Sequence, residues 1–282
     1  MIRFCIVALA TSASLLLDAS QPTFSARVDG IRVDILVTDS SRKPLRGLTP
    51  ADFVIRDNGV PQQVDVVSYG EIALNVGLAF DLSESVAGAR LGQLTTASRA
   101  LTSELRPADQ SALVTFDHAV SLPCPLSTDR TCIDSALSAA KPAGSTALID
   151  GVFAGMMVGE SDVGRSLLMV FSDGHETASF LRAERVLDMG RRTDVVVYPI
   201  APKGSRPDFL EELASLTGGR LHEVERTEDL SKTFRAILDE FRHRYLVTYT
   251  PRNVPQGGWH KLDVRVNKPG ARVKARPGYQ GT

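Results

Sequence analysis

Three polar side chains follow an apolar run at alternate positions. Asp81, Ser83 and Ser85 come directly after "ALNVGLAF". Serine and aspartate often cap the start of a helix, where they accept hydrogen bonds from free backbone N–H groups, but one cap explains only one of the three residues. A nucleophile site and part of a metal site are the two other interpretations.

Two later segments carry the same kind of side chain. Thr146 lies in "AGSTALIDG", between a Gly-Ser turn and a helix-like stretch, and Asp173 directly follows a second apolar run in "LLMVFSDGHE". If both apolar runs are strands of one sheet, these residues and Asp81, Ser83 and Ser85 lie at the same edge. Two carboxylates and three hydroxyls suit a hard cation such as Mg²⁺ or Mn²⁺. Zinc is not favoured, because no His or Cys stands at ligand spacing.

The segments that position these residues alternate between strand-like and helix-like patterns. Apolar runs at 73–80, 111–116, 166–172 and 195–200 alternate with helix-like stretches, among them 86–105, 147–159 and 227–241. Such alternation predicts an α/β fold with a doubly wound, mostly parallel six-stranded sheet. Only Asp117 and His118 separate two of the strand runs, so these two strands are expected to pair antiparallel.

The two flanks of this region have the period-2 alternation of half-buried strands, as in "IRVDILVTD" and "WHKLDVRVN". Asn58-Gly59 is a hairpin signal, and Thr49-Pro50 indicates a short helical turn. Neither flank is large enough to bury a good core by itself. We therefore expect residues 24–71 and 242–282 to form one β-sandwich, with an α/β domain at 72–241 inserted between them.

The first twenty residues, "MIRFCIVALATSASLLLDAS", have one Arg and then small and apolar residues. This pattern is typical of a secretory signal peptide at residues 1–20, with cleavage near Ala13 or Ala19. The alternative is a buried N-terminal strand or helix. No later stretch is long and apolar enough to cross a membrane. The expected location is therefore outside the cytoplasm: periplasmic, cell-surface or secreted.

Cysteine use and charge add two expectations. Removal of the signal removes Cys5 and leaves Cys124 and Cys132, which favours a disulfide in an exported protein, with two reduced thiols as the alternative. The chain of 282 residues has 43% hydrophobic residues and a net charge of −1. No basic run with interleaved aromatic residues is present, so a nucleic acid is not expected as a partner.

Taken together, Asp81-x-Ser83-x-Ser85, Thr146 of "GST" and Asp173 of "SDG" resemble the metal-ion-dependent adhesion site of von Willebrand factor A-type domains. Integrin inserted domains share this site. The resemblance covers roughly 72–241 and includes the antiparallel hairpin. The flanks "LRGLTPADFVIRDNG" and "FRHRYLVTYTP" look like those of bacterial secreted proteins with a related domain.

The resemblance implies a ligand set and a function. The three hydroxyls would bind the metal, the two aspartates would bind it directly or through water, and an open position would take an Asp or Glu of a protein partner. Ser145 stands where the family often has Gly. A shift of the last helix, "LSKTFRAILDEF", would make affinity switchable. The resemblance thus implies a metal-dependent binding and adhesion module, not an enzyme.

Other functions stay open. One is a structural scaffold of an envelope complex, in which the metal only holds loops together, and another is a site that has lost its metal affinity. A third is a metal-dependent hydrolase, which needs a general base. The nearest spare acids, Glu84 and Glu176, are expected to face solvent. "SDGHE" contains Ser, Asp and His but lacks the Gly-x-Ser-x-Gly pattern, and neighbours at a strand end do not form a triad.

The remaining conspicuous residues are expected to have structural roles. Three histidines are expected at turns or on the surface: His118, His243 and His260. Trp259 is expected in the core or at the rim of the sandwich, and Thr227 at the start of a helix. Three methionines are expected in the core: Met156, Met157 and Met169.

Overall fold

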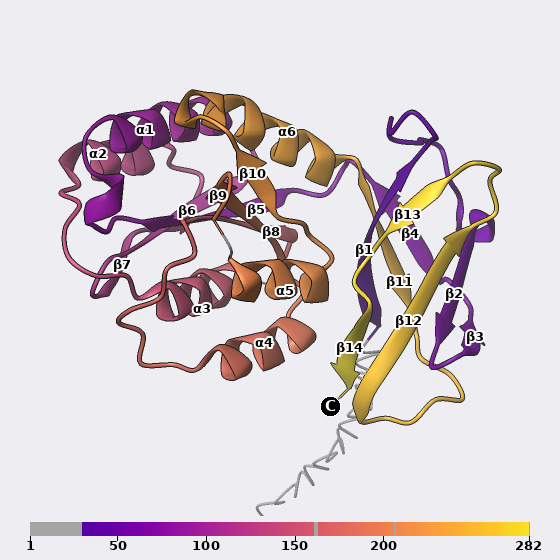
Figure 1. Ribbon diagram of the computed structural model, residues 1–282. Coiled ribbons are helices and arrows are strands. Elements are labelled where there is room, and N and C mark those ends of the chain that lie inside the picture. The colour runs from indigo at the N-terminus through magenta and orange to yellow at the C-terminus, as the bar shows by residue number, and fades with distance from the viewer. Residues whose placement is uncertain (1–29, 161–162, 206, 282) are drawn as a thin grey trace, which may run out of the picture.

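The chain folds into an α/β part and a β-sandwich that lie side by side (Figure 1). The computed structural model describes residues 30–160, 163–205 and 207–281. The predicted signal peptide lies outside the described residues. Among those described, no helix has the length and apolar character needed to cross a membrane.

A six-stranded sheet forms the centre of the α/β part, with the strand order β10-β9-β8-β5-β6-β7. All neighbouring strands are parallel except β6 and β7, which are antiparallel as predicted. The strands are β5 (Leu74–Asp81), β6 (Gln110–Phe116), β7 (Val120–Ser127), β8 (Arg165–Phe171), β9 (Val196–Pro202) and β10 (His222–Val224). Every residue of β5 and β8 is buried, which explains why both strands are nearly continuous apolar runs in the sequence.

Helices cover both faces of this sheet (Figure 1). One face carries α1 (Ala89–Thr102), α2 (Thr131–Ala139) and α6 (Leu230–Arg242), whose apolar side chains pack on β5 and β9. The other face carries α3 (Leu148–Gly159), α4 (Ala183–Arg192) and α5 (Asp208–Thr217). The doubly wound α/β fold predicted from the alternation is therefore confirmed.

The two flanks form a sandwich of two four-stranded sheets, ordered β13-β1-β11-β4 and β14-β12-β2-β3. Its strands are β1 (Ile31–Thr38), β2 (Phe53–Asp57), β3 (Val60–Gln62), β4 (Val66–Tyr69), β11 (Arg244–Tyr249), β12 (Gly258–Val266), β13 (Arg272–Lys274) and β14 (Gly278–Gly281). Each sheet contains strands from both flanks, as predicted. Asn58 and Gly59 have φ values of 47° and 83°, which the tight β2–β3 turn requires.

The chain enters and leaves the α/β part at neighbouring points. Strand β4 precedes the insertion and β11 follows it, and the two pair antiparallel with Tyr69 opposite Tyr245. Their rings lie 4.5 Å apart between centroids. The close termini expected of an inserted domain are therefore present.

Several local predictions need correction. The helix expected from residue 86 starts at Ala89, after a short 3-10 helix at Glu84–Val86. Thr227 does not cap α6, because a 3-10 helix at Thr227–Asp229 precedes it and Asp229 is the residue before its first turn. Met156 and Met169 are buried as expected, but Met157 is 52% exposed, because it lies on the outer side of α3.

Cys124 and Cys132 form a disulfide between β7 and α2, as predicted. Replacing both by Ser should lower the free energy of unfolding by about 2–3 kcal/mol, because the bond closes a loop of roughly nine residues in the unfolded chain. Urea unfolding of the two proteins measures the difference. Dithiothreitol should lower the midpoint of the wild type and leave that of the variant unchanged. Equal midpoints without reductant would contradict this expectation.

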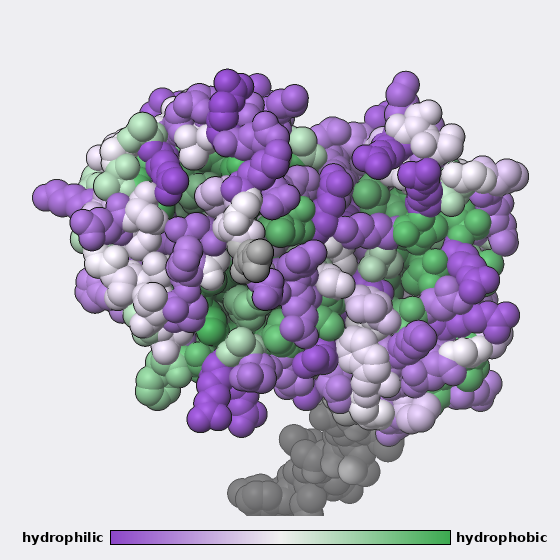
Figure 2. Space-filling model, in the orientation of Figure 1, coloured by the Kyte–Doolittle hydropathy of each residue, from purple (hydrophilic) through white to green (hydrophobic). Residues whose placement is uncertain are grey.

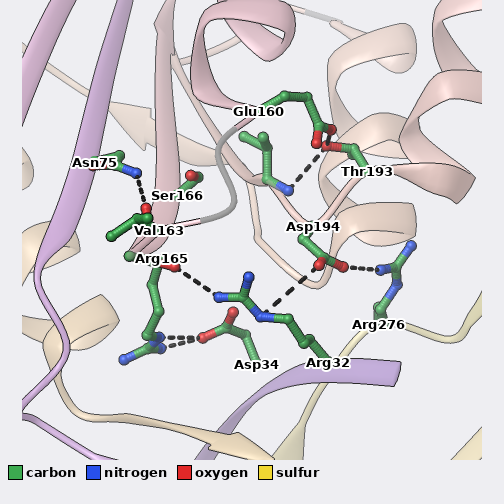
Figure 3. Close-up of polar contacts among 12 residues, drawn as sticks. Arg32, Asp34, Asn75, Glu160, Val163, Arg165, Ser166, Thr193, Asp194 and Arg276 are labelled. Carbon is green, nitrogen blue, oxygen red and sulfur yellow. Dashed lines mark hydrogen bonds and ion pairs between the residues drawn. The ribbon is translucent and has the colours of Figure 1, made fainter. Parts of the chain in front are cut away.

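Ion pairs join the two parts at the amino ends of β8 and β9 (Figure 3). Arg165 of the α/β part binds Asp34 of β1, and Arg32 of β1 donates to the Gly164 carbonyl at 2.7 Å. Asp194 lies between Arg32, at 4.0 Å, and Arg276, at 3.4 Å. The junction is therefore built from charged groups that pair across it.

Candidate metal centre

The centre begins where β5 ends, at Asp81. The carboxylate is fully buried, because β6 and β8 flank its strand on both sides. Its Oδ1 accepts a hydrogen bond from the Ser83 N–H at 2.9 Å, and its Oδ2 accepts one from the Ser172 hydroxyl at 2.9 Å. The first bond turns the chain directly after the strand and brings the following serines back over the strand end.

A short series of oxygen atoms leads from this turn to the end of β8. The hydroxyl oxygens of Ser83 and Ser85 lie 3.2 Å apart, and the Ser85 hydroxyl donates to Asp173 Oδ2 at 3.5 Å. Ser83 is buried, whereas the Asp173 side chain is 23% exposed. The structure therefore brings Asp81, Ser83, Ser85 and Asp173 together at one sheet edge, with the outer end of the group open to solvent.

Backbone hydrogen bonds place the Thr146 loop between these two strand ends. Ala143 N–H donates to the Leu82 carbonyl at 3.0 Å, which ties the loop to the end of β5. The Thr146 carbonyl accepts from the N–H groups of Thr177 and Ala178 at 3.0 and 3.1 Å, which ties it to the segment after Asp173. The Thr146 side chain is buried, and the hydrogen bonds of the loop's backbone fix its position.

The helix-cap interpretation of the serines is wrong. Helix α1 begins at Ala89 and is preceded by Gly88, so neither Ser83 nor Ser85 is at its start. Ser83 precedes the 3-10 helix at Glu84–Val86 but makes no side-chain capping bond to it. The side chains of both serines are therefore available to the group of oxygens.

The two hydrogen-bond donors to the Asp81 carboxylate are both uncharged. Burial raises the pKa of its carboxyl, the hydrogen bonds from Ser83 and Ser172 lower it, and the nearby Asp173 charge raises it again, with a net increase. Both donors to the carboxylate are uncharged, and the second carboxylate lies within reach of the same hydroxyls. A buried carboxylate of this kind is stabilised by a cation, and the oxygen donors fit a hard divalent ion.

Two residues that the sequence did not single out shape this site. The Ser172 hydroxyl donates to Asp81 and accepts from the Gly174 N–H at 3.1 Å, so it links the two strand ends. Gly174 has a φ of 84°, and a Cβ there would lie 2.7 Å from Pro207 Cβ, so the turn needs glycine. Their place in "SDG" at a strand end is the signal that points to both.

The acids nearest to the centre differ in what they contact. Glu84 and Glu176 are both exposed, as expected. Glu176 accepts bonds from the N–H groups of Ile149, Ala178 and Ser179 and from the Ser179 hydroxyl, at 2.7–3.0 Å. Burial raises its pKa, but these bonds outweigh burial, so the pKa lies below its usual value. Glu176 thus organises the start of α3 and is a weak base.

The described residues hold no group of three or more His, Cys, Asp and Glu side chains that could bind a metal. His175 is 80% exposed and contacts Asp173 Oδ1 at 3.1 Å, and His118 is 69% exposed. The oxygen donors of the centre are therefore two carboxylates and several hydroxyls.

One histidine prediction is wrong. His260 is not a surface residue: it is 1% exposed, and its Nδ1 lies 2.8 Å from Asp57 Oδ1 in the sandwich core. Trp259, which precedes it, is 38% exposed and lies at the rim of the sandwich as expected.

Comparisons with known proteins agree with this fold. The model of the von Willebrand factor type A domain matches residues 75–236, more than half of the chain. A search of curated proteins gives no match. Among solved structures, proximal thread matrix protein 1 from the mussel byssus, with a zinc-occupied MIDAS motif, has 17% identity and a TM-score of 0.54, covering 73% of this chain and 50% of its own.

Two bacterial structures are also similar in fold. The conserved hypothetical protein BatB from Bacteroides thetaiotaomicron has 15% identity and a TM-score of 0.51, covering 60% of this chain and 98% of its own. A mutant of the PilB minor pilin from Streptococcus sanguinis has 13% identity and a TM-score of 0.51, covering 62% and 63%. At these identities the similarity concerns the fold alone.

Proposed function

Because the chain belongs to the von Willebrand factor type A domain family, we propose that it is a metal-dependent protein-binding module. Domains of this family commonly mediate protein–protein interaction, and often bind a divalent metal at this site. The proposed ligands are Asp81, Ser83, Ser85, Thr146 and Asp173. The bound ion, Mg²⁺ or Mn²⁺, would supply an electrophilic position for an Asp or Glu of a protein partner.

The observation that carries the proposal is the buried carboxylate of Asp81 with neutral donors, linked through hydroxyls to a second carboxylate at the solvent edge. Two aspartates would balance the two charges of Mg²⁺. Net neutrality leaves the ion attractive to one more carboxylate. The hydroxyl ligands add no charge, so they do not reduce that attraction.

We propose a binding role without catalysis. A hydrolase of this kind would need a general base beside the metal-bound water. Glu176 is engaged by four donors that stabilise its charged form, and Glu84 is exposed. Export is part of the proposal, and the disulfide between Cys124 and Cys132 supports it, because such bonds persist in oxidising compartments.

Calorimetric titration with Mg²⁺, Mn²⁺ and Zn²⁺ tests the site. The wild type should bind one of these ions at a single site, and Asp81→Ala or Asp173→Ala should abolish measurable binding, because each removes half of the negative charge. Asp263→Ala is the matched control, since this exposed aspartate belongs to the sandwich strand β12. Metal binding that survives both site variants would refute the ligand assignment.

Pull-down of envelope proteins in Mg²⁺ and in EDTA tests the partner. A partner captured by the wild type in Mg²⁺ should be lost in EDTA and with Asp173→Ala. If the captured proteins are the same under both conditions, the contact does not run through a metal, and the scaffold function is favoured instead.

A further inference from the structure

The sandwich sheet that faces the α/β part has a cationic end. Along β1 and β13, Val37 and Val273 enter the sandwich core, so their neighbours point to the opposite face. On that face Leu36 lies opposite Arg244 of β11 on one side and opposite Lys274 of β13 on the other. Two cations therefore flank one leucine in a single cross-strand row.

A pocket of about 250 Å³ opens beside this row, between β13 and the end of α6. We call it the junction pocket, because both parts of the molecule line it. Its charged residues are Arg42, Arg220, Arg272, Lys274 and Glu240. Figure 2 shows hydrophilic side chains beside hydrophobic ones in this region, between the end of α6 and β13. A second hollow, of about 460 Å³, adjoins it, shares Arg220 and Lys274, and is also lined by Glu211 and Glu223.

Glu240 balances only one of these cations, Arg220. Its Oε2 accepts from Arg220, and its Oε1 accepts from the Tyr198 hydroxyl at 2.7 Å and lies 3.7 Å from Arg244 Nη2. In the described part of the chain, the side chains of Arg42, Arg272 and Lys274 have no hydrogen-bond or ion-pair partner. Of the four pocket cations, Arg220 is therefore paired with Glu240, and Arg42, Arg272 and Lys274 are left in excess.

Arg244, behind the pocket, adds a buried charge. It is completely buried, and its Nη2 donates to the Gly218 carbonyl at 2.7 Å. Its Nε and Nη1 are buried without a hydrogen-bond partner among the described residues. Burial and the charges of Arg244 and Arg220 lower the pKa of Lys274 to about 8. The pocket therefore has an excess of positive charge in partly buried surroundings, which favours an anion.

We propose that the junction pocket binds a phosphate-type oxyanion, held by Arg220, Arg272 and Lys274. A doubly charged group matches the excess charge better than a single carboxylate does. Guanidinium groups match the geometry of phosphate oxygens through paired hydrogen bonds. Such a ligand would join the α/β part to the sandwich. The pocket lies at the amino ends of the central strands, whereas the proposed metal centre lies at their carboxyl ends.

Titration of the full chain with inorganic phosphate, at constant ionic strength, tests the site. Wild type should bind phosphate, and Lys274→Gln or Arg272→Gln should weaken binding about tenfold or more, because each removes one charged donor. Neither change leaves a partner unpaired, so the thermal midpoint without phosphate should not fall. Lys141→Gln, at an exposed lysine of the α/β part, is the matched control. Absent binding, or equal affinity in all four proteins, would overturn the proposal.

The source of the phosphate group is distinguished with vesicles. Phosphatidylcholine vesicles with phosphatidic acid should capture the wild type, and not Lys274→Gln, if the group is a lipid headgroup. Phosphate binding without vesicle capture identifies a soluble phosphate compound. Asp81→Ala should bind phosphate like the wild type, so failure of the metal centre and failure of the junction pocket can be told apart.

Discussion

Replacing Arg165 by Met is expected to lower the free energy of unfolding by about 3–5 kcal/mol, because it leaves a buried partner charge uncompensated. The Arg165 side chain is 2% exposed. It binds Asp34, donates to the carbonyls of Arg244 and Phe241 at 3.2 and 3.3 Å, and lies 4.7 Å from the Phe241 ring centroid. One side chain thus connects β8, the end of α6 and the sandwich. Urea unfolding measures the loss.

A second variant identifies the cause. If the unpaired Asp34 carboxylate accounts for most of the loss, adding Asp34→Leu to Arg165→Met should restore more than half of it, because an apolar pair leaves no buried charge. Arg99→Met is the control: Arg99 is 62% exposed and pairs with Asp134 at the surface, where ion pairs contribute little. A loss at Arg165 no larger than at Arg99 would contradict this account.

Replacing Asp57 by Leu should have a similarly large effect, about 3–5 kcal/mol. The Asp57 carboxylate is fully buried between the two sandwich sheets. Its Oδ2 accepts from the hydroxyls of Tyr249 and Tyr279 at 2.9 and 2.7 Å, and its Oδ1 pairs with His260 Nδ1. Removing the carboxylate takes away the acceptor that these three buried side chains share, and leaves only the contact of 3.0 Å between the Tyr279 hydroxyl and His260 Nδ1. Urea unfolding at neutral pH measures the effect.

Two further variants make the Asp57 test specific. Asp57→Asn keeps the shape and one carbonyl acceptor, so its loss should be smaller than that of Asp57→Leu. Asp263→Leu, on the exposed side of β12, should have little effect. If Asp57→Leu and Asp263→Leu behave alike, the buried carboxylate is not important for the sandwich.

The α/β part was predictable because its signals are local. Strands such as β5 and β8 are buried on both faces, so most of their residues are apolar and the run is obvious in the sequence. The polar residues of the proposed metal centre lie at strand ends, and parallel strands bring their carboxyl ends to one edge. The grouping of Asp81, Ser83, Ser85 and Asp173 follows from the fold in this way.

Long-range polar contacts were not predictable in the same way. Arg165 and its partner Asp34 are 131 residues apart, and nothing near either residue indicates the other. His260 is different, because it lies in phase with Leu262 in "WHKLDV", on the face that enters the core. The period-2 pattern of this segment favours a buried position, whereas the predicted surface position rested only on the polar character of histidine. Met157 is apolar and follows the buried Met156 in an apolar helix, so its type gave no signal of its exposure.

The nested order of the two parts has a consequence for how the chain folds. Ile31 pairs with Tyr249, so the first sandwich strand has a partner more than two hundred residues away in the sequence. Closing so long a loop in an unfolded chain is slow and costs entropy. Once the α/β part has formed, β4 and β11 emerge side by side, and the loop is already closed. If the inserted domain forms first, it therefore brings β4 and β11 together and shortens the loop that the sandwich has to close.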